Sequence, residues 1–310
     1  MKTAEDWADA RGFDRDRVDV GEVALHYVAA GDEDAPLLLL LHGFPEFWYA
    51  WRDYLDPLAE EYRVVAPDLR GYNESDRPEA VEQYALSHLR GDVAGLIDAL
   101  GHESAHVVGH DWGGTLAQSV ALHRPDVVEN LVVMNAPYPE RFFEQASLRQ
   151  LPKSWYVLFF QTPIAERAIS LSEYRAFAEG FRRGTAVEDA YSEEDIERYR
   201  HAWGKPDATT AMVNWYRALA REEGRTGLEA FRARLTGRGE RAWQGGRRIK
   251  APTLLLWGEK DVALTTDVAR FVENRIEDCE VRWYPDATHW LPNEYPERVL
   301  GEIRAFLSGR

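Results

Sequence analysis

The sequence predicts an α/β fold, with a mostly parallel sheet that carries helices on both faces and an all-helical cap inserted into the chain. Three observations carry this prediction: short apolar runs alternate with helix-like stretches, the alternation stops after Met134, and it resumes near Ala251. Apolar strands that alternate with helices are typical of parallel sheets, whose crossover helices bury both faces. Because ligands in such sheets bind outside the carboxyl ends of the strands, we expect the functional residues there.

The predicted strands are short runs rich in leucine, β-branched and aromatic residues. In chain order they are Val23–Val28, Leu37–Leu41, Arg63–Ala66, Ala105–Val108, Leu131–Met134, Thr253–Trp257 and Val281–Tyr284. The helix-like stretches between them include Trp51–Glu60, Ala85–Leu100 and Gly114–His123. The strongest apolar run, at residues 37–41, is far shorter than the roughly 20 residues of a membrane-spanning helix.

The segment between residues 137 and 246 has no clear strand pattern and predicts helices and loops. It is rich in large aromatic side chains, namely Trp155, Tyr156, Phe159, Phe160, Phe177, Phe181, Trp203, Trp215 and Tyr216. We therefore expect a helical cap over residues 137–246, inserted between a first core segment at 1–136 and a second at 247–310. The pair Gly245-Gly246 marks the expected return of the chain to the core.

Composition and charge indicate which binding partners and which cellular compartment the protein is expected to have. The 310 residues are 45% hydrophobic, which is enough to bury a full core, and the net charge is −16. Such a charge repels nucleic acids and anionic membranes, so we expect neither as a partner. A lone Cys279 and an N-terminus without the apolar region of a signal peptide predict a cytoplasmic protein. The acidic, lysine-poor composition fits either a salt-rich habitat or a genome that favours arginine.

The segment Val107–Gly114 (VVGHDWGG) has the pattern of a strand, a sharp turn and a helix, with Asp111 at the centre of a G-x-D-x-G turn. Glycines at such a turn let the backbone and the helix pass close to a strained nucleophile. A carboxylate is a poor nucleophile toward esters and amides but a competent one toward saturated carbon, where attack gives an ester that must then be hydrolysed. Asp111 therefore points to epoxides or alkyl halides, unless it only caps the helix that follows.

Hydrolysis of that ester requires a base that activates water. His289 lies just after the last predicted strand, and Asp261 follows the preceding one. The order nucleophile, acid, histidine along the chain is the order found in one large class of α/β enzymes. Asp261 is therefore the expected partner of His289, with Glu259 and Glu140 as weaker candidates for the acid.

The oxyanion that forms during ester hydrolysis requires backbone N–H donors. We expect one from Trp112, the residue after the nucleophile. The second is expected from Phe44, in the loop His42-Gly43-Phe44-Pro45 after the run of leucines. A cis peptide bond before Pro45 would hold that turn.

Residues 42–52 (HGFPEFWYAWR), residues 109–114 (GHDWGG) and the pair of Asp261 and His289 resemble the α/β-hydrolase-fold epoxide hydrolases. The similarity runs through the core into the cap and so covers most of the chain. It implies an α/β-hydrolase core that opens an epoxide with water and has neither cofactor nor metal. The aromatic cap indicates a small apolar or aryl epoxide.

In that family two cap tyrosines grip the epoxide oxygen. Residues 155–163 (WYVLFFQTP) and 214–217 (NWYR) resemble the family's tyrosine segments, which implies Tyr156 and Tyr216. The chemistry agrees, because ring opening creates an alkoxide to which a phenol can donate a hydrogen bond or a proton.

Two other functions are alternatives to this one. A haloalkane dehalogenase shares the aspartate and the base but binds the leaving halide with side-chain N–H groups. Trp112 offers one such group. The second often comes from an asparagine where this chain has Phe44, which has no side-chain donor, or from a tryptophan of the cap. A non-catalytic receptor on this fold is expected to have lost the nucleophile, the acid or the base, and here all are present.

The sequence also contains an H-E-x-x-H pattern at His102–His106, which on a helix binds zinc. Gly101 predicts the end of a helix before this pattern, and His106 opens a predicted strand. On a strand, positions four apart are separated by more than ~12 Å, too far for two ligand bonds of ~2 Å to one ion. We therefore expect no metal site.

Overall fold

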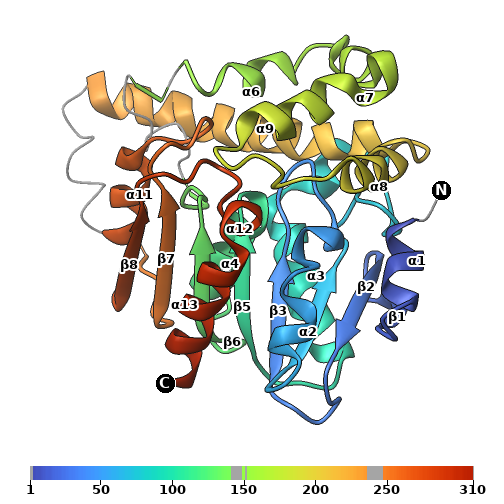
Figure 1. Cartoon of the computed structure of the whole chain (residues 1–310). Helices are drawn as coiled ribbons and strands as arrows, with labels where there is room; N and C mark the ends of the chain where they lie inside the picture. The colour runs from blue at the N-terminus through green and yellow to red at the C-terminus, as the bar shows by residue number, and fades with distance from the viewer. Residues whose placement is uncertain (1–2, 141–148, 151, 236–246, 310) are drawn as a thin grey trace.

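The computed structural model describes residues 3–140, 149–150, 152–235 and 247–309, so the predicted return at Gly245-Gly246 lies outside the described residues. An eight-stranded sheet runs through the molecule in the order β1-β2-β4-β3-β5-β6-β7-β8 (Figure 1). The strands are β1 (Asp14–Asp19), β2 (Ala24–Ala30), β3 (Leu37–Leu41), β4 (Arg63–Pro67), β5 (Ala105–His110), β6 (Val128–Met134), β7 (Thr253–Gly258) and β8 (Cys279–Tyr284). β1 and β2 are antiparallel to their neighbours, and the strands from β4 to β8 are mutually parallel, as the sequence predicts.

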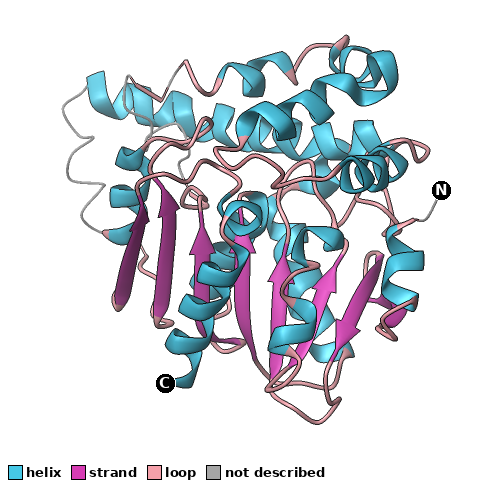
Figure 2. Cartoon of the chain, viewed as in Figure 1, coloured by secondary structure: helices cyan, strands magenta, loops and turns pink. Residues whose placement is uncertain are grey.

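Helices cover both faces of the sheet, and a further layer of helices lies across the carboxyl ends of its parallel strands (Figures 1 and 2). The helices of the core are α1 (Ala4–Asp9), η1 (Trp48–Trp51), α2 (Leu55–Leu58), η2 (Val81–Tyr84), α3 (Leu86–Ala99), α4 (Trp112–His123), α11 (Thr266–Glu273), α12 (Leu291–Glu294) and α13 (Pro296–Ser308). The helices across the strand ends are α6 (Trp155–Phe159), α7 (Ala165–Gly184), α8 (Glu193–Trp203) and α9 (Ala208–Leu235).

The helical layer comes from the segment between β6 and β7, and its described part contains helices and loops without a strand. The expected helical insertion is therefore present. The division of the chain into 1–136, 137–246 and 247–310 stays a prediction, because the second boundary adjoins residues outside the described part.

Every predicted strand is present, and the largest shift of an end is at β6, which starts at Val128 and not at Leu131. β1 is the strand that the sequence reasoning missed. Its residues are charged and mostly exposed, so it has no apolar pattern, and it forms through backbone pairing with β2 at the edge of the sheet.

The predicted helix at Trp51–Glu60 is present only in part. The chain forms the 3₁₀-helix η1 and then the four-residue helix α2. Pro57 explains the interruption, because in a continuous helix its ring would clash with the carbonyl of Asp53, four residues earlier. Pro57 is tolerated in the first turns of α2, which begins at Leu55.

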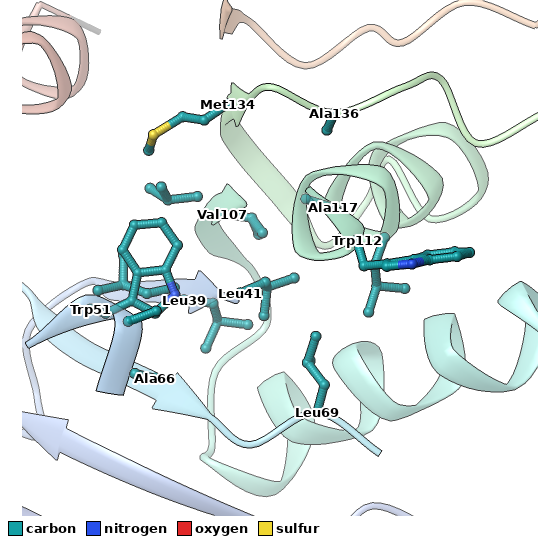
Figure 3. Close-up of a cluster of buried hydrophobic side chains, with 14 of the residues drawn as sticks. Leu39, Leu41, Trp51, Ala66, Leu69, Val107, Trp112, Ala117, Met134 and Ala136 are labelled. Carbon is teal, nitrogen blue, oxygen red and sulfur yellow. The ribbon is translucent and has the colours of Figure 1, made fainter. Parts of the chain in front are cut away.

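The core of the sheet is fully buried around β3. Leu39 and Leu41 of β3, Val107 of β5 and Met134 of β6 are all 0% exposed and belong to one apolar cluster, part of which is drawn in Figure 3. Burial of one leucine side chain contributes about 1.5–3 kcal/mol. Trp112, the first residue of α4, extends this cluster to the carboxyl ends of the strands.

Within the described residues, we find no helix with the length and apolarity that crossing a bilayer demands.

Candidate active site

Asp111 occupies the sharp turn between β5 and α4, with φ 51° and ψ −120°. The turn requires its flanking glycines, because a Cβ atom on Gly113 would lie 2.1 Å from the carbonyl oxygen of Leu41, and one on Gly109 would lie 2.4 Å from the oxygen of Gly113. Positive φ at a non-glycine residue is strained and persists where the surroundings enforce it. The Asp111 side chain makes no capping hydrogen bond to α4, so its carboxylate is not a helix cap.

The two oxygens of the Asp111 carboxylate have different neighbours. Oδ1 accepts a hydrogen bond from the backbone N–H of Phe44 at 2.9 Å, and Oδ2 lies 3.4 Å from Nε2 of His289. The Phe44-Pro45 peptide bond is cis, as the sequence predicts. Gly43 lies so close to Asp111 that a Cβ atom there would be 2.6 Å from the Cβ of Asp111.

His289 and Asp261 form a buried pair beside Asp111. Nδ1 of His289 lies 2.9 Å from Oδ2 of Asp261, and the two residues are 5% and 1% exposed. Neither weaker candidate for the acid is placed in this way: Glu259 is exposed, and Glu140 lies 3.5 Å from His123. The structure therefore brings three of the predicted site residues into one row, from Asp261 through His289 to Asp111.

Tyr156 of α6 and Tyr216 of α9 are neighbours of Asp111 around one cavity. Their rings are 5.7 Å apart and nearly perpendicular, and both border the same cavity as Asp111. The Tyr216 ring also packs edge-on against Phe44 and Trp112. Of the predicted site residues, Asp111, Trp112, Tyr156 and Tyr216 line this cavity. Phe44 and His289 contact Asp111 behind it, and Asp261 contacts His289.

That cavity is narrow and partly open to solvent. Its lining is mainly apolar, and the residues besides Asp111 and the two tyrosines are Trp112, Thr115, Pro137, Tyr138, Pro139, Val157, Leu219 and Leu264. A concave, mostly apolar space with a few convergent polar groups is the usual form of a small-molecule site.

Comparison with known proteins agrees with this geometry. Residues 36–294 match the model of the "alpha/beta hydrolase fold" family. The chain is 37% identical to Epoxide hydrolase 3 of Xenopus tropicalis, with 92% of this chain and 75% of that protein covered. It is also 37% identical to the AB hydrolase superfamily protein YfhM of Bacillus subtilis, with 94% and 97% covered. The crystal structure of epoxide hydrolase VrEH1 from Vigna radiata superposes with a TM-score of 0.79 at 25% identity, covering 97% of this chain and 99% of that one.

The chain belongs to the epoxide hydrolase family of the α/β-hydrolases. This confirms the resemblance drawn from the sequence and, with it, the α/β-hydrolase fold.

In the site of this epoxide hydrolase family member, the histidine and the two aspartates stabilise one another's charged forms. Burial disfavours the charged form of His289, but the carboxylates of Asp261 and Asp111 outweigh it and hold the pKa of His289 well above its ordinary value. Burial likewise opposes ionisation of Asp111, but the hydrogen bond and charge of His289 prevail and lower the pKa of Asp111. The same histidine outweighs burial at Asp261 and lowers its pKa.

The two tyrosines stay protonated. Burial raises the pKa of Tyr156, and the Asp111 charge raises it further. Burial also raises the pKa of Tyr216, with smaller contributions in the same direction from Tyr156 and Asp111. Both phenols are therefore available as hydrogen-bond donors at neutral pH.

Asn135, directly after β6, is a residue that the sequence reasoning missed. Its Nδ2 donates to Oδ2 of Asp261 at 2.6 Å, and its Oδ1 accepts from the N–H of Gly258 at 3.1 Å. Asp261 is fixed further by the N–H groups of Ala263 and Leu264, which donate to its Oδ1 at 2.6 and 2.8 Å. A polar residue at the carboxyl end of an apolar strand is the signal that points to Asn135.

A second missed group lies behind the histidine. His110, next to the nucleophile, donates from Nε2 to the carbonyl of His289 at 2.8 Å, and its Nδ1 lies 3.3 Å from Glu46. Oε1 of Glu46 accepts hydrogen bonds from the hydroxyls of Tyr191 and Tyr199. Two tyrosines of the helical layer are thereby connected with the loop that carries His289.

The H-E-x-x-H pattern does not lie on a helix, because His106 lies on β5 and His102 precedes that strand. Within the part of the chain that the structure describes, no three His, Cys, Asp or Glu side chains are grouped to hold a metal ion.

Proposed function

We propose that the chain hydrolyses epoxides to vicinal diols through a covalent ester on Asp111. One arrangement supports the proposal above all others: the Asp111 carboxylate, free of any capping bond, lies between His289 and a cavity bordered by Tyr156 and Tyr216. Curated relatives that are themselves called epoxide hydrolases support the activity.

In the first step, Oδ2 of Asp111 attacks a ring carbon of the epoxide, and the bond between that carbon and the ring oxygen breaks. The electron pair of the broken bond goes to the oxygen, which receives hydrogen bonds and a proton from the phenols of Tyr156 and Tyr216. Oδ1 remains held by the N–H of Phe44. The products of this step are an ester of Asp111 and a new hydroxyl group on the neighbouring carbon.

In the second step, His289 takes a proton from a water molecule, whose oxygen adds to the carbonyl carbon of the ester. The N–H groups of Phe44 and Trp112 bind the oxyanion that forms on Oδ1; Trp112 opens α4, where N–H groups have no partner within the helix. Collapse of this intermediate breaks the bond to the alkyl oxygen, which takes the proton back from His289 and leaves as the diol. Asp111 is left as the carboxylic acid, and its proton returns to the phenolate formed in the first step, which restores both groups. Asp261, held by Asn135, orients His289 and stabilises its charged form.

The lining of the cavity indicates the class of substrate. Trp112, Val157, Leu219 and Leu264 offer apolar surface, and Tyr138 adds an aromatic ring. An apolar or aryl epoxide of modest size fits such walls, because it buries its hydrocarbon part while its oxygen faces the phenols.

Turnover of styrene oxide beside 1-chlorohexane tests the proposed reaction. We expect diol from the epoxide, no chloride from the alkane, and neither product from the Asp111→Asn variant. Gas chromatography and a chloride assay measure the two products. Chloride release without diol would instead favour the dehalogenase, in which the indole of Trp112 faces the leaving halide.

The two chemical steps should depend on pH in different ways. Ester formation requires ionised Asp111, whose lowered pKa keeps it ionised at neutral pH, and does not require a neutral histidine. Hydrolysis requires neutral His289, whose pKa is raised by two carboxylates. Formation of the ester removes the negative charge of Asp111, one of these two carboxylates. The pKa of His289 then falls, so His289 becomes a competent base only in the ester.

Single-turnover rates between about pH 5 and about pH 9 measure the pH dependence of each step. We expect a level rate of ester formation and a rate of hydrolysis that rises to a plateau as pH increases. A rate of hydrolysis that is level across the range would argue against His289 as the base.

A further inference from the structure

Gln150 fastens the segment that leads into α6 to the loop that carries Asp261. Its side chain is 1% exposed and uses both ends of its amide on the backbone of that loop. Nε2 donates to the carbonyl of Ala263 at 2.7 Å, and Oε1 accepts from the N–H of Thr265 at 2.8 Å. Lys153 adds a hydrogen bond from Nζ to the carbonyl of Asp261. A partly buried donor and a partly buried acceptor of the loop thus bind one buried side chain.

The same residue begins the turn that leads to Tyr156. The carbonyl of Gln150 accepts hydrogen bonds from the N–H groups of Lys153 and Ser154 at 3.0 and 3.1 Å, and Nε2 also donates to the Ser154 hydroxyl at 3.1 Å. The carbonyl of Ser154 in turn accepts from the N–H of Val157 in the first turn of α6. A short chain of hydrogen bonds therefore runs from the Asp261 loop to the helix that presents Tyr156.

α6 depends on such anchors because it is only five residues long. Isolated helices of this length are unstable in water. Packing holds it incompletely, since Trp155 and Leu158 on its outer face are 64% and 71% exposed. At the far end of α6, Nε2 of Gln161 donates to the carbonyls of Val157 and Tyr216. Gln150 supplies the corresponding anchor at the near end.

We propose that Gln150 is a positioning residue for epoxide opening, which sets the place of the Tyr156 phenol relative to Asp111. The inference rests on the function proposed above. Gln150 makes no hydrogen bond to the Asp261 carboxylate itself, which is held by Asn135 from outside that loop and by the N–H groups of Ala263 and Leu264. Loss of the Gln150 amide should therefore impair the step that uses Tyr156 and leave the step that uses Asp261 and His289 nearly unchanged.

The test is a single-turnover comparison of the wild type with Gln150→Met, which keeps the length of the side chain and removes both polar ends. Rapid quenching and intact-protein mass spectrometry follow the rise and decay of the ester formed from styrene oxide. We expect ester formation to slow by about 10- to 100-fold, the order of loss that a small misplacement of a catalytic group causes. We expect hydrolysis of the ester to change by less than about threefold.

A double-mutant cycle separates positioning from a general loss of stability. If Gln150 acts through the Tyr156 hydroxyl, Gln150→Met should slow ester formation little further in a Tyr156→Phe background. Gln83→Met, on the 3₁₀-helix η2, is the matched control and should behave like the wild type. Gln150→Glu, which keeps the acceptor for Thr265 and loses the donor to Ala263, repeats the cycle if Gln150→Met does not fold.

Wild-type rates of ester formation in a folded Gln150 variant would overturn the inference, as would effects that add to those of Tyr156→Phe or that slow both steps equally. Failure of the proposed function would look different, because the wild type itself would then form no ester on Asp111.

Discussion

Replacement of His289 by glutamine is expected to stop turnover after the first chemical step and to leave the substrate attached to Asp111. Attack of Oδ2 on a saturated carbon requires no base, whereas addition of water to the ester does. Glutamine keeps the approximate size of the side chain but cannot accept a proton. Because general-base catalysis contributes about 10²–10⁴ in rate, the ester should decay slowly enough to be isolated.

Intact-protein mass spectrometry after incubation with styrene oxide measures this result. The His289→Gln variant should gain the mass of one epoxide, and peptide mapping should place it on Asp111. Asp111→Ala in the same background is the control and should gain nothing while it keeps the circular dichroism spectrum of the wild type. A folded His289→Gln variant without an adduct would refute the assignment of these two residues.

Removal of the two phenolic hydroxyls is expected to slow the opening of the epoxide. Tyr156→Phe and Tyr216→Phe should each reduce the rate of ester formation by a factor of order 10²–10³, the usual loss for one donor to a developing oxyanion. The double variant should be almost inactive, because no other phenol of the cavity is expected to replace them. Both tyrosines are protonated at neutral pH since burial raises their pKa values.

Tyr138→Phe is a matched control for these variants. Tyr138 borders the same cavity, but its hydroxyl donates to the carbonyl of Arg247 at 2.9 Å and is therefore already engaged. This control should open the epoxide at nearly the wild-type rate. If the double variant also formed ester at the wild-type rate, the two tyrosines would serve only to pack the helical layer.

The parts of the site that could be predicted from sequence are those encoded in short segments. The turn at Asp111 depends on glycines within three residues of it, and these are visible in the sequence because only glycine permits such close backbone contacts. The cis bond before Pro45 is local in the same sense. His289 and Asp261 could be placed because each follows a predicted strand of a parallel sheet within a few residues.

The parts that could not be predicted depend on contacts between distant segments. Asn135 contacts Asp261 across 126 residues of sequence, and Glu46 contacts the hydroxyls of Tyr191 and Tyr199 across 145 and 153 residues. No periodicity records such pairs, because each partner by itself is an ordinary polar residue. The charged strand β1 escaped prediction for a related reason: its stability comes from the backbone of its neighbour β2 rather than from its own side chains.

The different neighbours of the two Asp111 oxygens determine where one oxygen atom of the diol comes from. Oδ1 is held by the N–H of Phe44 throughout the proposed cycle, so Oδ2 is the oxygen that leaves with the diol and water supplies its replacement. Each diol therefore carries an oxygen atom that entered the protein during the preceding turnover. In heavy-oxygen water the first diol from each enzyme molecule would be unlabelled and every later one labelled, while Oδ1 keeps its original isotope unless the carboxylate rotates.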